Sequence, residues 1–330
     1  MLTEAMARKA IKEIMDSPER SSRNLVDMAL NFAEGQYLRE FLFKVQSVLK
    51  DENSPYYRMI IDSMNHIDTE KLINFGMNIG YNSVTIGSPK IREIEQKENF
   101  DIPWSLYLDM KNYSDNNFEK YNKLLKEGRN LGIFSYLIGT EKKVQDVLKL
   151  VSKHNDCAFV IFVKSKEITE EFIEKASCID NIMIAVKASE DADRACLLLR
   201  NNKMLYSIYF HYEESDYEHI TSGEFIENIE TLRPTFTIFA ANDGCKEDTS
   251  LKIYDYIKKT RLNQSYITIP WDAIYDTRYI DGKISDNICS AAIDANGLLI
   301  KFRDGVELTE LNVFNKGLHD SLKEALPKNK

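Results

Sequence analysis

The sequence has no closely spaced pair of cysteines. Its five cysteines are Cys157, Cys178, Cys196, Cys245 and Cys289, and the closest two, Cys178 and Cys196, lie 18 residues apart. Structural zinc sites and many iron–sulfur clusters take ligands from CxxC-type pairs, so a local metal-ligand signature is missing. The HExxH motif of zinc hydrolases is also missing. We therefore predict reduced, mostly buried thiols and no metal site.

Long apolar runs are absent as well. No stretch approaches the roughly 20 residues that a membrane-spanning helix needs, so we predict no membrane span. The first residues, MLTEAMARKAIKEIMDS, mix charged and apolar side chains at helical spacing. They lack the uninterrupted apolar segment of a secretory signal peptide. We therefore expect the protein to stay in the cytoplasm.

The sequence also lacks runs of basic residues and glycine-rich phosphate-binding loops. The formal net charge is -9, and an acidic surface opposes binding to nucleic acids and to anionic membranes. Neither GxGxxG nor GxxxxGK[ST] occurs, so the common nucleotide-binding loops are not predicted. We expect no nucleic-acid partner.

The chain does have enough apolar residues, 43% of 330, to build a large core. Residues 1–100 show helical periodicity and no strand pattern. Ser54-Pro55, Asp68-Thr69-Glu70 and Ser88-Pro89 each suit the start of a helix, because such side chains cap free backbone N–H groups and proline is favoured in the first turn.

From residue 102 the pattern changes to apolar runs of strand length that alternate with amphipathic helices. Six βα units follow one another, which predicts a parallel sheet with helices outside it. The predicted strands are 104–108, 132–138, 158–163, 182–186, 205–210 and 235–240. After Ile269-Pro270-Trp271 the alternation is predicted to stop. Asn296-Gly297, between two apolar runs, predicts a β-hairpin, and a helix over 316–326 follows.

These features resemble the bacterial radical-SAM family with a helical N-terminal extension, a partial (β/α)6 barrel and a C-terminal auxiliary segment. Asn99–Asp109 resembles the first barrel strand of that family, and Phe118–Ile133 the helix and strand after it. Lys153–Phe159 resembles the entry to the third strand, and Asp294–Gly297 the hairpin near the C-terminus. The resemblance implies an α/β fold with a TIM-like partial barrel. It implies boundaries at 1–100 for the helical region, 101–262 for the barrel and 263–330 for the degenerate auxiliary segment.

The functional positions of the family are changed. The family carries CxxxCxxC in the loop after the first strand, where three thiolates hold a [4Fe–4S] cluster that binds S-adenosylmethionine. Here that loop is Met110–Asn117, eight residues without a cysteine. The family's Gly-Gly-Glu-Pro resembles only Ile138–Glu141. Cys289 matches one auxiliary-cluster cysteine, but the other expected one falls near Phe302. We therefore expect no iron–sulfur cluster and no radical-SAM chemistry.

Polar residues at the predicted C-terminal strand ends are the candidate pocket residues, because barrel chemistry occurs there. Their alternative interpretation is that they are solvated loop and strand ends. The candidates are Asp109, Lys111, Glu141, Lys164, Lys187, His211 and Asp243. No catalytic residue is assigned among them.

Three functions remain open at this stage. The first is a non-catalytic pseudoenzyme that acts as a scaffold, regulatory or substrate-binding partner of an active radical-SAM homologue or another protein. The second is an enzyme that uses the barrel pocket without a cluster, through Lys164, Lys187, His211 and Asp243. The third is a sensor that binds S-adenosylmethionine or a nucleotide, with Glu141 as its retained contact.

Overall fold

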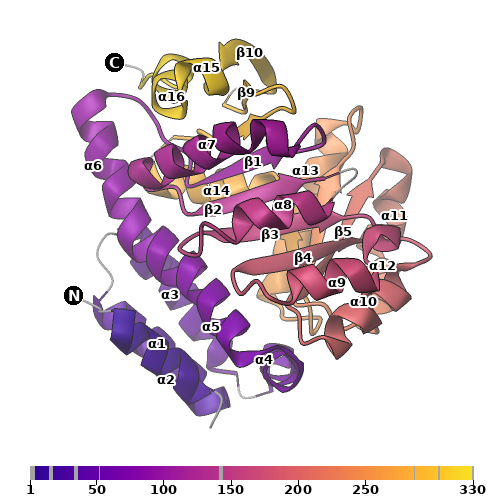
Figure 1. Cartoon of the computed structure of the whole chain (residues 1–330). Coiled ribbons are helices and arrows are strands. Elements are labelled where there is room, and N and C mark those ends of the chain that lie inside the picture. Colours follow the sequence, from indigo (N-terminus) through magenta and orange to yellow (C-terminus); the bar gives the residue numbers. More distant parts are fainter. Residues whose placement is uncertain are drawn as a thin grey trace. The chain divides into compact units, whose positions relative to one another are not determined.

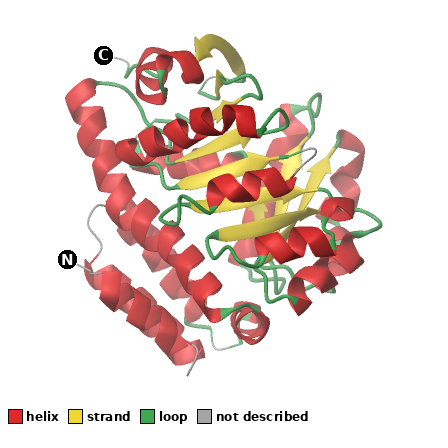
Figure 2. Cartoon of the chain, in the orientation of Figure 1, coloured by secondary structure: helices red, strands yellow, loops and turns green. Residues whose placement is uncertain are grey.

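Figures 1 and 2 show the computed structural model of the chain. Its residues group into two compact units. The structure describes residues 4–14, 18–32, 36–51, 53–140, 144–285, 287–303 and 305–328. Unit 1 comprises Met1–Ile73 and Ile184–Asp276, and unit 2 comprises Asn74–Met183 and Thr277–Lys330. The chain therefore crosses between the units three times, and each unit contains its own part of the βα alternation.

Unit 1 begins with helices and continues with parallel strands. Ser54 caps α4 by accepting the N–H of Tyr56 over 3.2 Å, and Asp68 accepts the N–H of Glu70 over 3.0 Å at the start of α5. Both helix starts were predicted from these capping side chains. The helices before the sheet are α1 (Glu4–Ile14), α2 (Pro18–Phe32), α3 (Gln36–Leu49), α4 (Pro55–His66) and α5 (Thr69–Met77), the last of which continues into unit 2.

The sheet of unit 1 has the strand order β4-β5-β6-β7, with all neighbours parallel. Its strands are β4 (Ile182–Lys187), β5 (Tyr206–Tyr212), β6 (Phe236–Ala241) and β7 (Ile269–Asp272), β4 beginning at the end of unit 2. The connecting helices are α10 (Ala192–Asn201), α11 (Tyr217–Thr221), α12 (Glu224–Glu230) and α13 (Glu247–Leu262). The expectation that alternation stops after residue 271 is wrong, because Ile269–Asp272 pairs with β6 as a further parallel strand.

Unit 2 has the strand order β10-β9-β8-β1-β2-β3. Its strands are β1 (Ser105–Asp109), β2 (Ser135–Gly139), β3 (Ala158–Val163), β8 (Ala291–Ile293), β9 (Leu298–Lys301) and β10 (Glu307–Asn312). The hairpin β8–β9 turns at Gly297, which has φ +88°, so the predicted Asn-Gly turn is confirmed. β8 also pairs in parallel with β1, so the C-terminal segment extends the sheet. β10 was not predicted.

The helices of unit 2 include a ten-residue π-helix that the sequence did not predict. Asn78–Gly87 (η1) links α5 to α6, so the chain stays helical where two separate helices were expected. The α-helices are α6 (Ser88–Glu98), α7 (Phe118–Leu131), α8 (Val144–Val151), α9 (Glu170–Ala176), α14 (Tyr275–Ile284), α15 (Val313–Lys316) and α16 (Leu318–Ala325). Of these, α14 was missed, and its first residues belong to unit 1.

The two faces of the unit 2 sheet differ in burial. Leu106, Leu108, Ile138, Phe159 and Ile161 are completely buried and, by the strand register, share a face with Tyr136, whose hydroxyl lies against Gly128 of α7. The residues that alternate with them along the strands point to the other face and are more exposed; Tyr107 of β1, for example, retains 38% of its accessible surface. Because successive side chains of a strand point to opposite faces, the sheet has one packed face and one open face.

A close approach of two backbones at Gly87 and Gly132 holds η1 against the end of α7. A Cβ atom at Gly87 would overlap the carbonyl oxygen of Gly132. We expect Gly87→Ala to lower the free energy of unfolding by about 1–3 kcal/mol, because backbone must move to admit the methyl group. Gly80→Ala in the same helix is the control, since nothing lies within 4 Å of its Cβ position. Urea denaturation measures both, and equal stability of the two variants would contradict the packing.

Candidate functional site

The loop after β1 is a compact turn held by its own hydrogen bonds. The N–H of Met110 donates to the carbonyl of Gly139 over 2.8 Å, and the N–H of Tyr113 donates to the carbonyl of Met110 over 3.0 Å. Asn117 closes the turn, because its Oδ1 accepts the N–H of Ser114 and its Nδ2 donates to the carbonyl of Asn112. Tyr113 is buried, and its ring meets that of Tyr121 edge to face at 5.4 Å.

The donor set of this loop does not fit a [4Fe–4S] cluster. Its side chains supply amides, hydroxyls, a lysine, an aspartate and a thioether, whereas the cluster needs thiolates. Within the described ranges, no three His, Cys, Asp or Glu side chains come together where they could hold a metal ion. Cys157 lies at the opposite, N-terminal end of β3, and Cys289 is completely buried before β8.

Two of the candidate residues in unit 2 form an ion pair. Asp109 ends β1, and its carboxylate lies 3.1 Å from Lys111 Nζ while it also accepts the backbone N–H of Lys111 over 3.1 Å. Lys164 follows β3, where its carbonyl accepts the N–H of Glu167 over 2.8 Å. These three residues therefore lie at C-terminal strand ends, as predicted. Glu141 lies outside the described residues.

Tyr107 covers the end of β2 on the open face of unit 2. A Cβ atom at Gly139 would overlap the Tyr107 phenol oxygen, so the ring lies directly on this glycine. Gly139 belongs to Ile138–Glu141, the segment compared above with the Gly-Gly-Glu-Pro of the radical-SAM family. An aromatic side chain therefore lies on the backbone of that segment.

The candidate residues of unit 1 gather around His211. Lys187 is the register partner of Tyr209, and the Tyr209 ring meets the His211 ring edge to face at 5.3 Å. Burial and the charge of Lys187 lower the pKa of His211, while Asp243 opposes them. Ile238 pairs with both Tyr209 and Trp271, so Trp271 points to the same face of the sheet. The result is a patch, which we call the His211 face, of Lys187, Tyr209, His211 and Trp271.

A second polar cluster in unit 1 was missed by the sequence analysis. It contains Tyr212 at the end of β5, Cys245 and Ser250 before and in α13, and Asp272 at the end of β7. Asp272 is 1% exposed, and burial raises its pKa to about 7. The missing signal was β7 itself: once Ile269–Asp272 is recognised as a strand, Asp272 stands at a C-terminal strand end like the other candidates.

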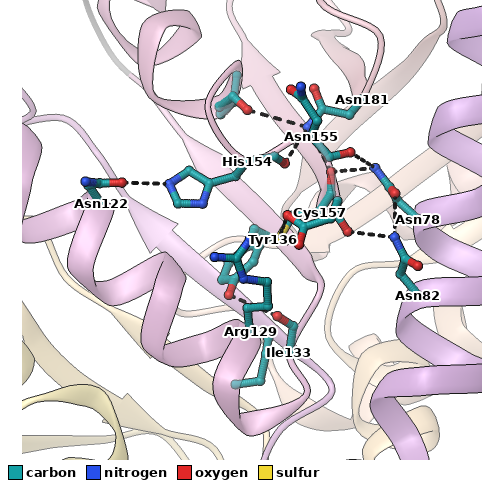
Figure 3. Close-up of polar contacts among 12 residues, drawn as sticks. Asn78, Asn82, Asn122, Arg129, Ile133, Tyr136, His154, Asn155, Cys157 and Asn181 are labelled. Carbon is teal, nitrogen blue, oxygen red and sulfur yellow. Dashed lines mark hydrogen bonds and ion pairs between the residues drawn. The ribbon is translucent and has the colours of Figure 1, made fainter.

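An asparagine network fixes the opposite, N-terminal end of β3 (Figure 3). Asn78 Nδ2 donates to the carbonyls of Asn155 and Cys157 over 2.8 and 2.9 Å, and Asn82 Nδ2 donates to that of Asp156. Asn181 Nδ2 donates to the carbonyl of Cys157 from the other side over 2.9 Å. The carbonyl groups of this turn face away from the hydrogen bonds of the sheet, and the asparagine amides supply their hydrogen-bond donors. These amides tie the η1 helix, on which Asn78 and Asn82 lie four residues apart, to this turn.

His154 in this network makes stability depend on pH. It is 1% exposed, its Nε2 lies 3.1 Å from Asn122 Oδ1, and burial together with Arg129 lowers its pKa from 6.5 to about 4. The neutral ring is therefore favoured in the fold, so its contribution is complete above pH 6.5 and is lost as the pH falls toward 4. Relative to His154→Gln, we expect the natural protein to lose about 2 kcal/mol of unfolding free energy between pH 6.5 and 5. Urea titrations at both pH values measure this difference, and a constant difference would contradict a buried neutral histidine.

One pocket of unit 2 lies away from the strand ends. It measures about 340 Å³ and lies between the end of α6, α7 and the turn into α16. Four of its polar side chains are already engaged: His319 bridges Glu98 and Asp320, and Glu127 accepts the N–H of Leu318 over 2.6 Å.

Comparison with known proteins yields structural relatives only. No family model and no curated protein matches the sequence. The structure is similar to that of SuiB from Streptococcus suis, a radical-SAM enzyme, solved bound to S-adenosylmethionine, with a TM-score of 0.54 and 13% identity over 71% of this chain and 67% of that one. SuiB solved with its precursor peptide SuiA gives a TM-score of 0.54 at 12% identity, over 71% and 68% of the two chains.

A further SuiB structure extends the similarity to 86% of this chain and 80% of that chain, with a TM-score of 0.53 and 13% identity. Similarity at this level of identity shows a shared fold. The predicted α/β class and the radical-SAM-like, partial TIM-like barrel are thus confirmed. Among the described residues, no helix combines the length and the apolar character needed to span a bilayer.

Proposed function

We propose that this chain is a non-catalytic protein with a radical-SAM-like fold, which binds a peptide or protein partner as a scaffold, regulatory or substrate-binding subunit. The observation that carries the proposal is the loop after β1. Its eight residues contain no thiol, and hydrogen bonds from Met110, Tyr113 and Asn117 hold it as a closed turn. A protein that keeps the strands and helices of this fold, but has such a turn in place of the cysteine-bearing loop, cannot anchor an iron–sulfur cluster there.

The His211 face supports a peptide as the partner. It combines two aromatic rings, which are enriched where proteins bind other proteins, with the polar side chains of a lysine and a histidine. The similar protein SuiB has been solved with its precursor peptide. The net charge of -9 disfavours nucleic acid as the alternative polymer.

Selection from a displayed peptide library against the purified full-length protein tests this proposal. Peptides that bind should lose at least about tenfold in affinity with Trp271→Ala or His211→Ala, because aromatic anchors carry most of the binding energy of such sites. Lys259→Ala, on the exposed side of α13, is the matched control and should leave affinity unchanged. Selected peptides that bind all variants equally, or a library without any binder, would overturn a peptide-binding role for this face.

S-adenosylmethionine is the second candidate ligand, because a SuiB structure contains it. A thermal-shift titration distinguishes the two cases. An increase in Tm at millimolar S-adenosylmethionine would support a sensor role. An increase that Tyr107→Ala enhances would locate binding beside Gly139, since the Tyr107 ring lies there.

A further inference from the structure

One pocket of unit 1 lies at the N-terminal ends of β6 and β7, away from the strand ends that carry the candidate residues. It measures about 280 Å³ and lies between α4, the end of α12 and the segments that lead into the two strands. All of its lining residues belong to unit 1. A cavity of about 150 Å³ holds benzene, so a pocket of this volume admits a ligand about twice as large.

Asp62 lines this pocket, but its charge is already balanced. Arg200 holds it with both terminal nitrogens, Nη2 to Oδ1 over 2.6 Å and Nη1 to Oδ2 over 2.8 Å. Arg233 Nη1 adds a third bond, to Oδ1 over 3.2 Å, from a side chain that is 63% exposed. Because Asp62 keeps Arg200 and exposed ion pairs are weak, Arg233 can turn toward another anion at little cost.

Arg58 supplies a second guanidinium to the pocket, one turn before Asp62 on α4. It is exposed, and within the described ranges its guanidinium has no ion-pair partner. Glu230 is the remaining acid of the lining, and its Oε1 accepts the backbone N–H of Ile267. Two arginines thus face one carboxylate that already has a donor, in a protein whose net charge is -9. This local excess of positive charge favours an anionic ligand.

The backbone at Arg233 adopts a conformation that costs stability. Its φ is +53°, and its N–H donates to the carbonyl of Glu230 over 3.0 Å just after α12. Glycine is the usual residue in the left-handed region at a helix end, and the following Pro234 favours an extended backbone at this position instead. A strained residue that persists points to a function of its side chain. Here the side chain brings a guanidinium to the pocket.

The rest of the lining is mostly apolar. Met59, Pro234 and Ile267 contribute hydrocarbon surface, and Ser63 and Thr268 are buried residues that carry hydroxyl groups. The planar fork of an arginine binds pairs of carboxylate or phosphate oxygens, and two forks at one pocket can share a single anionic group. The pocket therefore offers anion-binding donors beside an apolar wall.

We propose that this pocket binds a small organic anion, a carboxylate or a phosphate monoester whose charged group is held by Arg58 and Arg233. The apolar body of the ligand packs on Met59 and Ile267, and the pair of Asp62 with Arg200 stays intact. This site is independent of the peptide-binding proposal, because it shares no residue with the His211 face.

Fluorine NMR of small probes in the presence of the full-length protein tests the proposal. The probes are 4-fluorobenzoate, 4-fluorophenyl phosphate and the neutral 4-fluorobenzamide. At least one of the two anions should bind at millimolar concentration, at least about tenfold more tightly than the amide, because hydrogen bonds to charged groups are the stronger ones. Comparison of the two anions distinguishes carboxylate from phosphate chemistry. Raising the salt concentration to about 0.5 M should weaken binding, because the two arginines are exposed.

Two variants separate the role of the arginines from effects on the fold. Arg233→Gly removes the guanidinium and places glycine where φ is positive, so the fold should be kept. Arg58→Gln changes an exposed side chain, and each variant should weaken binding of the anion at least about tenfold. Lys203→Gly is the matched control: Lys203 also has a positive φ, +54°, and is exposed, but it does not line the pocket, so binding should be unchanged.

Three results would overturn the proposal. The first is that neither anion binds to the natural protein at ten millimolar, a concentration about tenfold above the expected range. The second is that the neutral amide binds as tightly as the anions. The third is that Arg233→Gly and Arg58→Gln bind the anion as tightly as Lys203→Gly does.

Discussion

Arg261→Ala is expected to lower the free energy of unfolding by about 3–5 kcal/mol, because it leaves a buried carboxylate without its cation. Asp276 retains only 4% of its side-chain surface, and Arg261 holds it with both terminal nitrogens, at 2.9 and 2.7 Å. The same guanidinium donates to the carbonyl of Pro270 and packs on the Trp271 ring at 5.5 Å. Arg261, in α13, thereby links this helix to β7 and to the start of α14. Urea denaturation at pH 7 measures the change.

Arg233 gives the matched control for this prediction. It pairs with Asp62 over 3.2 Å, but 63% of its side chain is exposed, and Asp62 keeps a second, bidentate partner in Arg200. Exposed ion pairs contribute at most about 1 kcal/mol, so Arg233→Ala should be mild. Adding Asp276→Asn to Arg261→Ala should restore part of the loss by removing the unpaired charge. An Arg261→Ala protein as stable as Arg233→Ala would contradict the buried pair.

Asp281→Asn is expected to stabilise the protein at pH 8 and to change its pH dependence. Asp281 is fully buried in α14, accepts the N–H of Trp104 over 3.0 Å and accepts the hydroxyl of Ser290. Burial raises its pKa from 3.8 to about 7, so the fold favours the protonated acid. Its contribution is therefore complete below pH 3.8 and is lost as the pH rises through 7. Asparagine can still accept the N–H of Trp104 through its Oδ1, it meets the Ser290 hydroxyl with its Nδ2 as the donor, and it carries no charge.

The difference between the two proteins isolates this one group. Between pH 4 and pH 8, the natural protein should lose about 4 kcal/mol of unfolding free energy relative to Asp281→Asn. The fold favours the neutral form of both Asp281 and His154. Because one is an acid and the other a base, the Asp281 contribution to stability falls as the pH rises, whereas the His154 contribution rises, so the two variants check each other. A difference that grows in favour of the natural protein at high pH would show that Asp281 is stabilised as the carboxylate.

The repeated βα pattern was readable from the sequence because buried parallel strands are short apolar runs bounded by polar turns. β3 was predicted with its observed bounds, and the Asn296-Gly297 turn with its hairpin. β7 was not, since Ile269–Asp272 contains a proline and only four residues, and proline fits a strand only where its missing N–H is not needed. The contacts of the π-helix η1 could not be predicted, because the carbonyls to which Asn78 and Asn82 donate lie more than 70 residues away in the sequence and come close only in the folded chain.

The candidate site could likewise be predicted only in part from the sequence. The positions of six candidates at strand ends could be predicted, because each lies in the last residues of an apolar run or just after it. They are Asp109, Lys111, Lys164, Lys187, His211 and Asp243. Their pairing could not, because the Asp109–Lys111 ion pair and the Tyr209–His211 ring contact depend on side-chain direction and register. The Asp272 cluster was missed together with β7, which carries it.

Anaerobic reconstitution with ferrous iron and sulfide, followed by iron analysis and absorption spectroscopy, tests the central claim most directly. The loop Met110–Asn117 has no thiolate to bind iron, so the protein should remain colourless and contain no iron above that of a blank reaction, while a radical-SAM enzyme treated in parallel turns brown. A brown protein with about four irons per chain would contradict the account.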